Sequence, residues 1–275
     1  MRVFEPKTAV KEIACRDGRI RDDVRVVPEE VPVALSYGGS THAVMMGTPA
    51  DLEDFALGFS LTEGVIASIS EIERVDVVEE TKGLDVQITL AEDKEEALRQ
   101  RRRHMAGPVG CGLCGIESID QAMRPVPQLS TLPLKLTTKQ ITDAVRSLNT
   151  AQPLHHETRA VHGAGFFVPG RGLVAVREDV GRHNALDKLI GAAAALGLDG
   201  ASGAVVVTSR ISVEMVQKAA ILGSPILIAI SAPTALAVRT AEEAGMTLVA
   251  LARGDDFEIF TRADRINTGA IAHVA

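Results

Sequence analysis

The chain of 275 residues has no tryptophan, one tyrosine and seven phenylalanines, so aromatic residues make up only 3% of it. Hydrophobic residues nevertheless make up 46% and charged residues 24%, which is ordinary for a globular protein. The core must therefore be built from valine, isoleucine, leucine and alanine. A chain of this length can hold one large domain or two ordinary ones.

The sequence also lacks an excess of positive charge, a hydrophobic leader and a long apolar run. Its 29 basic and 36 acidic side chains give a net charge of −7, so no overall positive field draws it to nucleic acid or to an anionic membrane. The first residues lack the apolar segment of a signal peptide, and the apolar run 225–230 is far shorter than the ~20 residues that span a bilayer. We expect a cytoplasmic protein with no nucleic-acid and no membrane partner.

Cysteine is scarce, but two of the three cysteines stand close together. Cys111 and Cys114 lie in the run Gly-Cys-Gly-Leu-Cys-Gly at 110–115, and the third is Cys15. Glycine contributes no side chain to a core, so this run serves to expose the thiols or to hold something. Residues 116–123 are predicted to form a short helix, and a helix N-terminus favours a thiolate. Cys111 and Cys114 are therefore candidate catalytic nucleophiles.

Three kinds of site compete for this thiol pair. A structural zinc site needs two more ligands, which Cys15 and a histidine would have to supply from far away in the sequence. A thioredoxin-like redox pair is expected inside a βαβ unit, between its strand and its helix, and the pair in this chain lacks that context. A persulfide carrier needs one exposed thiolate of low pKa on a flexible backbone with an acceptor site nearby. The glycines and the helix that follows favour this third reading.

The first part of the chain is predicted to be a small α+β domain, residues 1–130, with the thiol pair near its end. One helix begins near Thr48–Asp51 and carries Leu52, Phe55 and Phe59 inward. Short strands surround it and are expected to form an antiparallel sheet: 24–27, 31–35, 43–46, 75–78 and 84–90. The charged segment 92–105, with four arginines, is interpreted as a solvated helix face. Prolines at 125, 127 and 133 mark a linker.

The second part, residues 131–275, is predicted to be an α/β domain with a three-layer αβα sandwich. Apolar strands at 173–176, 204–208, 226–230 and 247–252, with one more at 256–260, are separated by alanine-rich helices at 184–196, 212–222 and 234–244. Such sheets bind ligands outside the carboxyl ends of their parallel strands. Polar or glycine-containing connections follow these ends, at 177–179, 209–210, 231–233 and 253–255. Ser212 and Thr234 are possible helix caps.

The densest polar cluster is the segment 177–188, which straddles a strand-to-helix turn. The simpler reading is a salt-bridged helix cap, with Asp179 or Asn184 as the N-cap and with Asp187 and Lys188 in solvent. The functional reading places the cluster at the ligand-binding end of the sheet. There Asp179 would accept hydrogen bonds from a guanine or pterin edge, and Arg182 and His183 would donate them.

The motif His155-His156-Glu157, followed by His162, suggests a metal site. Zinc deaminases use His-x-Glu before a Pro-Cys-x-x-Cys motif. In this chain the Cys-x-x-Cys comes first and follows glycine, so the order is reversed and a zinc hydrolase is the weakest interpretation. His162 is expected at the end of a strand, as a buried histidine whose hydrogen bonds are satisfied.

With these residues in view, the chain resembles the formate dehydrogenase accessory protein family (FdhD). The resemblance runs in family order over about two thirds of the chain. It is carried by the segments 38–40, 110–115, 177–188, 209–215, 231–234, 253–254 and 257–261.

The resemblance implies a sulfurtransferase. Members take a persulfide from a cysteine desulfurase and pass its sulfur to the molybdenum bis(molybdopterin guanine dinucleotide) cofactor of formate dehydrogenase. The first cysteine of the pair, which maps to Cys111, carries the persulfide, while Cys114 would tune or resolve it. The resemblance also implies a homodimer, a second domain like the cytidine deaminase fold without zinc ligands, and a cofactor-binding stretch at 251–256. With the strand-end residues, the expected cofactor-binding set is Asp179, Arg182, His183, Ser209, Arg210, Leu251, Ala252, Arg253, Gly254, Asp255 and Asp256.

Two points remain open in the sequence. The family usually shows Thr-Gly-Gly-x-His where this chain has Thr158-Arg159-Ala160-Val161-His162, and a residue other than glycine is strained at positive φ. The rival hypothesis is a chaperone that binds the molybdenum cofactor without transferring sulfur.

Overall fold

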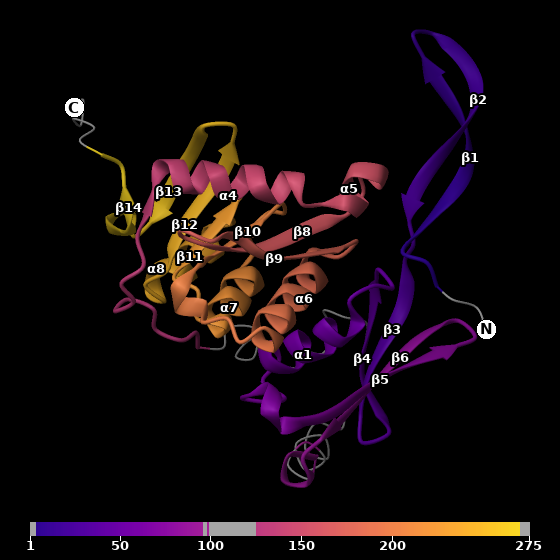
Figure 1. The fold of residues 1–275 in the computed structure, drawn as a ribbon, viewed down its shortest axis with the longest axis horizontal. Helices are drawn as coiled ribbons and strands as arrows, with labels where there is room; N and C mark the ends of the chain where they lie inside the picture. The colour runs from indigo at the N-terminus through magenta and orange to yellow at the C-terminus, as the bar shows by residue number, and fades with distance from the viewer. Residues whose placement is uncertain (1–3, 96–97, 99–124, 270–275) are drawn as a thin grey trace.

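The computed structural model describes residues 4–95, 98 and 125–269 (Figure 1). Cys111, Cys114 and the predicted helix at 116–123 lie outside the described residues, as do the arginines of the segment 92–105. Among the helices in the described ranges, none is both long and apolar enough to cross a membrane.

The first part of the chain forms a small sheet with one helix packed on it. Within the described residues this sheet has four strands in the order β4-β3-β6-β5. Alternate side chains of β3, from Val31 to Tyr37, are buried against Phe55 and Phe59 of the helix, as predicted. The elements are β3 (Val31–Tyr37), β4 (Ser40–Gly47), α1 (Leu52–Thr62), η1 (Ile69–Glu71), β5 (Ile72–Glu80) and β6 (Gly83–Leu90).

The prediction of an antiparallel sheet is wrong for its central pair, because β3 and β6 run parallel. The chain between them passes through β4, α1 and β5, and parallel neighbours require such a long connection. The outer pairs, β3 with β4 and β5 with β6, are antiparallel as expected.

A long hairpin, which we call the arm, precedes this sheet. It consists of β1 (Lys7–Arg16) and β2 (Arg19–Pro28), which pair over their full length and project away from the rest of the molecule (Figure 1). Its turn contains Asp17 and Gly18 with φ of 52° and 71°, the left-handed values that a tight Asp-Gly hairpin turn requires. Only the end of β2 was predicted.

The second part of the chain forms the large sheet. Its described strands follow the order β13-β12-β11-β10-β8-β9. They are β8 (His162–Val168), β9 (Gly172–Asp179), β10 (Ala204–Val207), β11 (Ile226–Ala229), β12 (Thr247–Arg253) and β13 (Asp256–Thr261). Strands β10, β11 and β12 are parallel, while β8 and β13 are antiparallel to their neighbours. Because β9 is in turn antiparallel to β8, it points the same way as β10–β12, and its carboxyl end lies at the same edge.

Helices cover both faces of this sheet, which confirms the three layers (Figure 1). Alternate residues of β10 divide between two cores: Val205 and Val207 pack with α6 and α7, and Ala204 and Val206 pack with α4. The helices are α4 (Thr138–Thr150) on one face, and α6 (Arg182–Ala195), α7 (Val213–Leu222) and α8 (Ala235–Glu243) on the other. The sequence analysis did not anticipate α4. The likeness to the cytidine deaminase fold stays a prediction.

Smaller elements complete the described chain: β7 (Leu136–Thr137), α5 (Pro153–Thr158), η2 (Gly200–Ser202), η3 (Ala263–Arg265) and β14 (Ile266–Asn267). Strand β7 pairs with β14 and leads directly into α4.

The two parts meet where α1 crosses α6, at two glycines. A Cβ atom at Gly58 would lie 1.7 Å from the backbone oxygen of Asp187, and one at Gly191 would lie 1.9 Å from that of Asp54. Only glycine allows the two helix backbones to approach this closely. We call this contact the α1–α6 seam. The predicted boundary near residue 130 stays a prediction.

Candidate functional site at the carboxyl edge of the large sheet

The predicted strand-end residues gather at one edge of the large sheet, because β9–β12 point the same way. Backbone hydrogen bonds tie the connections there to one another. Ile211 N donates to the Ala232 oxygen at 3.2 Å, Thr234 N to the Ile211 oxygen at 2.9 Å, and Leu251 N to the Ser231 oxygen at 3.3 Å. The Thr234 side chain caps α8 as predicted, accepting from Ala237 N, whereas the prediction for Ser212 is wrong, because its hydroxyl makes no capping hydrogen bond at the start of α7. This edge is therefore a connected surface, and we call it the carboxyl edge.

Asp179 lies at this edge, but its carboxylate is fully used inside the protein. The residue is 0% exposed, and four donors reach its two oxygens. They are Thr48 N at 3.0 Å, Gly181 N at 2.7 Å, Asn184 Nδ2 at 3.0 Å and Lys188 Nζ at 2.6 Å. These donors fill the acceptor sites of a carboxylate. Asp179 therefore holds the turn before α6 in place, and it would have to release a partner to contact a ligand.

The simpler reading of the 177–188 segment, with Asp187 and Lys188 in solvent, is wrong. Lys188 is 0% exposed and also donates to the Thr48 backbone oxygen at 2.9 Å. Asp187 is 1% exposed and accepts from Lys218 at 2.9 and 3.0 Å and from the Thr62 hydroxyl at 2.7 Å. Since Thr48 and Thr62 belong to the first part of the chain, these pairs join it to the second.

Burial and pairing change the ionisation of the Asp187–Lys218 pair. Burial raises the pKa of Asp187 above its usual value, against the opposing effect of Lys218. The pKa of Lys218 is raised as well, because the attraction of Asp187 and of Glu63 outweighs the cost of burying the ammonium. Lys218 also bonds Glu63 at 3.1 Å. The ammonium therefore stays charged at neutral pH and holds α7 to the α1–α6 seam.

Two nitrogens at the start of α6 differ from this buried network because they lack partners. Arg182 Nε and His183 Nε2 are both buried, and neither has a hydrogen-bond partner among the described residues. His183 Nε2 lies 3.7 Å from a carboxylate oxygen of Glu214, which is too long for a hydrogen bond. A buried polar atom without a partner costs free energy, so these two atoms indicate a place for a polar ligand.

His183 is neutral at neutral pH. Burial, followed by the positive charge of Arg182, lowers its pKa from 6.5 to about 4. A neutral imidazole offers either one donor or one acceptor at Nε2, depending on the tautomer. The positive potential at this edge therefore comes from the arginines and from the N-termini of α6 and α7, not from His183.

The remaining predicted ligand residues divide between exposed and buried positions. Ser209 is 4% exposed and its hydroxyl donates to the Arg210 oxygen, whereas the Arg210 side chain is exposed. Arg253 is exposed and donates to the Ile230 oxygen at 3.4 Å. Leu251 adopts a left-handed φ of 54° at an irregularity of β12, and Ala252 packs in the core. Within the 251–256 stretch, Arg253 and the turn after it thus face solvent.

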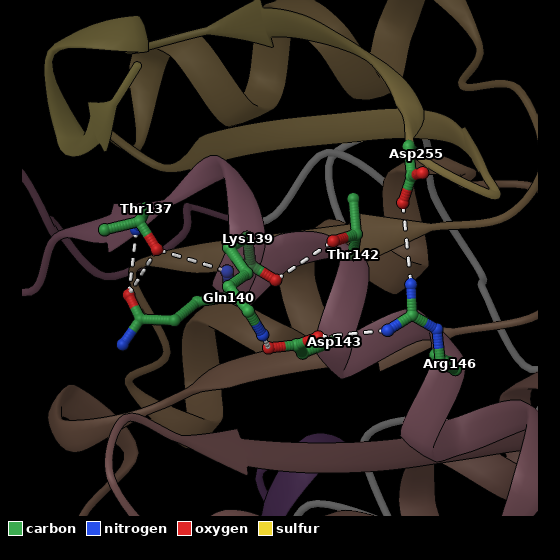
Figure 2. Close-up of polar contacts among 7 residues, drawn as sticks. All are labelled: Thr137, Lys139, Gln140, Thr142, Asp143, Arg146 and Asp255. Atoms are coloured by element: carbon green, nitrogen blue, oxygen red, sulfur yellow. Dashed lines mark hydrogen bonds and ion pairs between the residues drawn. The ribbon is translucent and has the colours of Figure 1, made fainter. Parts of the chain in front are cut away.

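A row of charges on α4 ends at this turn, and the sequence analysis did not single it out (Figure 2). Asp255 contacts Arg146 at 3.5 Å, and Arg146 in turn contacts Asp143 at 3.3 Å. The spacing of Lys139, Asp143 and Arg146 would have indicated a charged helix face. A groove of about 620 Å³ lies beside it, between the end of α4 and the strand β9, and it is lined by Arg146, Ser147, Thr150, Ala151 and Leu173–Val176.

The histidines near α5 have structural contacts. His155 Nδ1 lies 3.1 Å from the Val161 oxygen, and His156 Nε2 lies 2.7 Å from the Asn149 oxygen. His162 begins β8 opposite Asp179, so its predicted place at a strand end is confirmed, but its side chain is half-buried rather than buried, and this partial burial lowers its pKa. In the part of the chain that the structure describes, no group of three or more His, Cys, Asp or Glu side chains is arranged to hold a metal ion.

Arg159 stands where the family usually has a glycine, and its backbone keeps a conformation that glycine favours. Arg159 ends α5 with a left-handed φ of 59°, the conformation for which glycine is usually selected. Ala160 does not share this conformation. One of the two replaced glycines therefore marks a position where the backbone still turns through positive φ.

Comparisons with known proteins agree with this architecture. Residues 28–267 match the model of the FdhD/NarQ family. The chain belongs to this family. It is 65% identical over 257 residues to the sulfur carrier protein FdhD of Agrobacterium fabrum, covering 94% of this chain and 95% of that one. It is 59% identical over 257 residues to the FdhD of Brucella abortus, covering 94% and 96%.

A solved structure from Desulfotalea psychrophila, described as a formate dehydrogenase accessory protein, superposes with a TM-score of 0.73. Its sequence is 27% identical, and the match covers 95% of this chain and 100% of that one. The fold described above, with its small and its large sheet, is therefore the fold of an FdhD/NarQ family member.

Proposed function

We propose that this protein carries sulfur for the maturation of formate dehydrogenase. In this proposal Cys111 takes sulfur from the persulfide of a cysteine desulfurase and passes it to the molybdenum bis(molybdopterin guanine dinucleotide) cofactor. The cofactor is the substrate, and the catalytic subunit of formate dehydrogenase receives it. The protein would act as a cytoplasmic sulfurtransferase and as a homodimer.

The observation that carries the nucleotide part of the proposal is the pair of unpartnered nitrogens, Arg182 Nε and His183 Nε2. They lie at a strand-end edge that also presents Arg210 and Arg253 to solvent. An arginine fork suits phosphate, and helix N-termini suit anions. The guanine nucleotide ends of the cofactor have this chemistry. The names of the relatives, sulfur carrier proteins, support the sulfur part.

The sulfur steps balance without an external oxidant. The Cys111 thiolate attacks the outer sulfur of the desulfurase persulfide, so that one S–S bond forms as another breaks and the desulfurase cysteine leaves as a thiolate. For delivery, the Cys114 thiolate attacks the Cys111 sulfur and releases the outer sulfur as sulfide to the acceptor. The Cys111–Cys114 disulfide left behind is then reset by a thiol reductant.

The test is to load the purified chain with a desulfurase and cysteine and to locate added sulfur by intact and peptide mass. We expect 32 Da on the peptide that contains Cys111, as one sulfur atom requires, and its loss in Cys111→Ser. Cys15→Ser is the matched control and should load normally. Persulfide on Cys111→Ser, followed by delivery, would contradict the assignment.

The chaperone hypothesis predicts a different pair of results. A chaperone would bind a guanine nucleotide and mature formate dehydrogenase with Cys111 replaced by serine. The sulfur relay predicts normal nucleotide binding by Cys111→Ser together with inactive formate dehydrogenase.

A further inference from the structure

The arm exposes apolar side chains that a protein in water ordinarily covers. Ile13, Ile20 and Val24 are 74%, 76% and 62% exposed. Residues paired across the hairpin share a face, and successive residues alternate between faces. The pairs Ile13–Asp22, Cys15–Ile20, Lys11–Val24 and Ala9–Val26 therefore lie on one face. This face, which we call the apolar face of the arm, carries all three of these side chains, whereas Val10, which is 38% exposed, lies on the opposite face.

The opposite face of the arm is charged. Its pairs include Val10–Arg25, Glu12–Asp23, Ala14–Arg21 and Arg16–Arg19. The arm as a whole has six basic and four acidic side chains and a net charge of +2, so the rest of the chain carries −9. The arm is therefore an amphipathic hairpin whose charge is opposite to that of the body it projects from.

The base of the arm is fixed to the second part of the chain. Lys7 pairs with the Glu157 carboxylate at 2.6 Å, and Arg25 donates to the Thr158 backbone oxygen at 3.3 Å. Both partners belong to α5, so the direction in which the arm projects is set by the fold. A two-stranded hairpin alone is marginally stable in water, and a face of this kind needs constant cover.

The body offers a matching surface on β4, an edge strand of the small sheet. Val44 and Met46 are 48% and 49% exposed, and they pair with Ala34 and Pro32 of β3 on the same face. Among the described residues outside the arm, the other large exposed hydrophobic side chains are Val77, Leu196 and Phe260, each on a different element. The β4 strand thus carries the one pair of such side chains at i and i+2 in the described body.

We propose that the apolar face of the arm packs on β4 of a second copy of this chain, in a reciprocal contact. A second copy is always present, so it meets the need for constant cover. Its body is acidic and suits the arm, whose apolar face also carries Lys7 and Lys11, whereas two basic arms repel each other. An exchange in which each arm covers the other copy's β4 closes on itself as a two-fold dimer. The inference specifies the surface of the dimer and does not depend on sulfur transfer.

The test measures the mass of the full chain in solution by light scattering after size-exclusion chromatography. We expect a dimer for the parent and a monomer for Ile13→Asp/Ile20→Asp. The matched control Leu196→Asp replaces a side chain that is 61% exposed on the body and should remain a dimer. Circular dichroism checks that each variant folds. A monomeric parent, or a dimer that survives both arm substitutions, would overturn the proposal.

A crosslink identifies the acceptor surface without disturbing the arm. Cys15 lies on the apolar face, so in a Cys111→Ser/Cys114→Ser background a short bismaleimide should join it to Met46→Cys of the second copy as a covalent dimer. Leu196→Cys is the control and should give none. A Cys15–Cys15 crosslink in the absence of Met46→Cys would show that the arms pack on each other and would refute the β4 assignment. Persulfide loading of Cys111 is measured separately, so the two proposals can fail independently.

Discussion

The α1–α6 seam and the carboxyl edge contain the same kinds of side chain in opposite conditions. Beside the seam Asp187 and Lys218 are buried, as are Asp179 and Lys188 at the turn that leads into α6, and each has ionic and hydrogen-bonded partners. At the edge Arg182 and His183 keep nitrogens without partners, while Arg210 and Arg253 face solvent. One segment, 177–188, supplies residues to both. A dense polar motif can thus both assemble the fold and bind a ligand, and the pattern of hydrogen bonds tells the two roles apart.

The largest loss of stability should follow from breaking the buried ion pair between Asp179 and Lys188. Replacing Lys188 with alanine leaves the Asp179 carboxylate buried without its cation, which typically costs about 3–5 kcal/mol. We expect the free energy of unfolding, measured in urea, to fall by about that amount. Asp179→Asn/Lys188→Met, which removes both charges, should recover part of it. Lys188→Ala with unchanged stability would show that the seam does not join the two parts.

The next largest loss of stability should follow from a substitution at the glycine contact of the α1–α6 seam. Gly58→Ala would place a methyl group 1.7 Å from the Asp187 oxygen, so the helices must separate. Overpacking of this kind costs about 1–3 kcal/mol, and backbone clashes cost more. Thermal unfolding of Gly58→Ala measures it, and Glu53→Gly compared with Glu53→Ala, at an exposed position of α1, controls for helix propensity alone. A melting temperature for Gly58→Ala equal to that of the parent would contradict the close approach.

At the edge, replacing Arg182 should alter ligand binding and leave stability at neutral pH unchanged. Arg182→Gln removes a charged donor near the proposed nucleotide phosphates, and hydrogen bonds to charged groups contribute about 1.5–3 kcal/mol. We expect guanosine diphosphate to bind roughly 10- to 100-fold more weakly in calorimetry, with little change in unfolding. Arg171→Gln, in the turn before the amino end of β9 and so at the opposite end of this strand from the carboxyl edge, is the control. If Arg182→Gln bound guanosine diphosphate as tightly as the parent, Arg182 would not contact the nucleotide.

The smallest effect concerns pH. Because burial lowers the pKa of His183 to about 4 from 6.5, the unfolded chain takes up a proton at this residue before the folded chain does. The contribution of His183 to stability is therefore complete above pH 6.5 and declines as the pH falls toward 4, by about 1–3 kcal/mol. His183→Gln should flatten the dependence of the unfolding free energy on pH in this range. An NMR titration of the His183 imidazole with a midpoint near 6.5 would contradict it.

The sequence predicted the periodic elements well and the long-range contacts poorly. The strands β9–β12 and helices α6–α8 follow local hydrophobic patterns, and their shared direction placed the carboxyl edge correctly. The parallel pairing of β3 with β6 and the insertion of β8 between β9 and β10 depend on contacts far apart in the chain, which no local pattern contains. The arm was missed although Asp17-Gly18 is a strong hairpin signal, because its strands lack a covered face.

The candidate site was likewise predicted only in part, because its long-range contacts leave no local pattern. Arg182, His183 and Arg253 could be selected from their position after strands. Nothing in the sequence reveals that Lys188 reaches the Thr48 oxygen, or that Asp187 faces α1, because these partners lie more than 100 residues away. The roles of Cys111 and Cys114 rest on the motif and on the family resemblance.

The most direct test of the account is to map where guanosine diphosphate binds, by hydrogen exchange of the full chain with and without the nucleotide. The account predicts that the nucleotide slows exchange of the backbone amides in the carboxyl-edge segments 180–183, 209–212, 231–233 and 253–256. It predicts no change in exchange at the groove beside Leu173–Val176. Protection confined to that groove, or to the arm, would contradict the assignment of the carboxyl edge as the cofactor-binding surface.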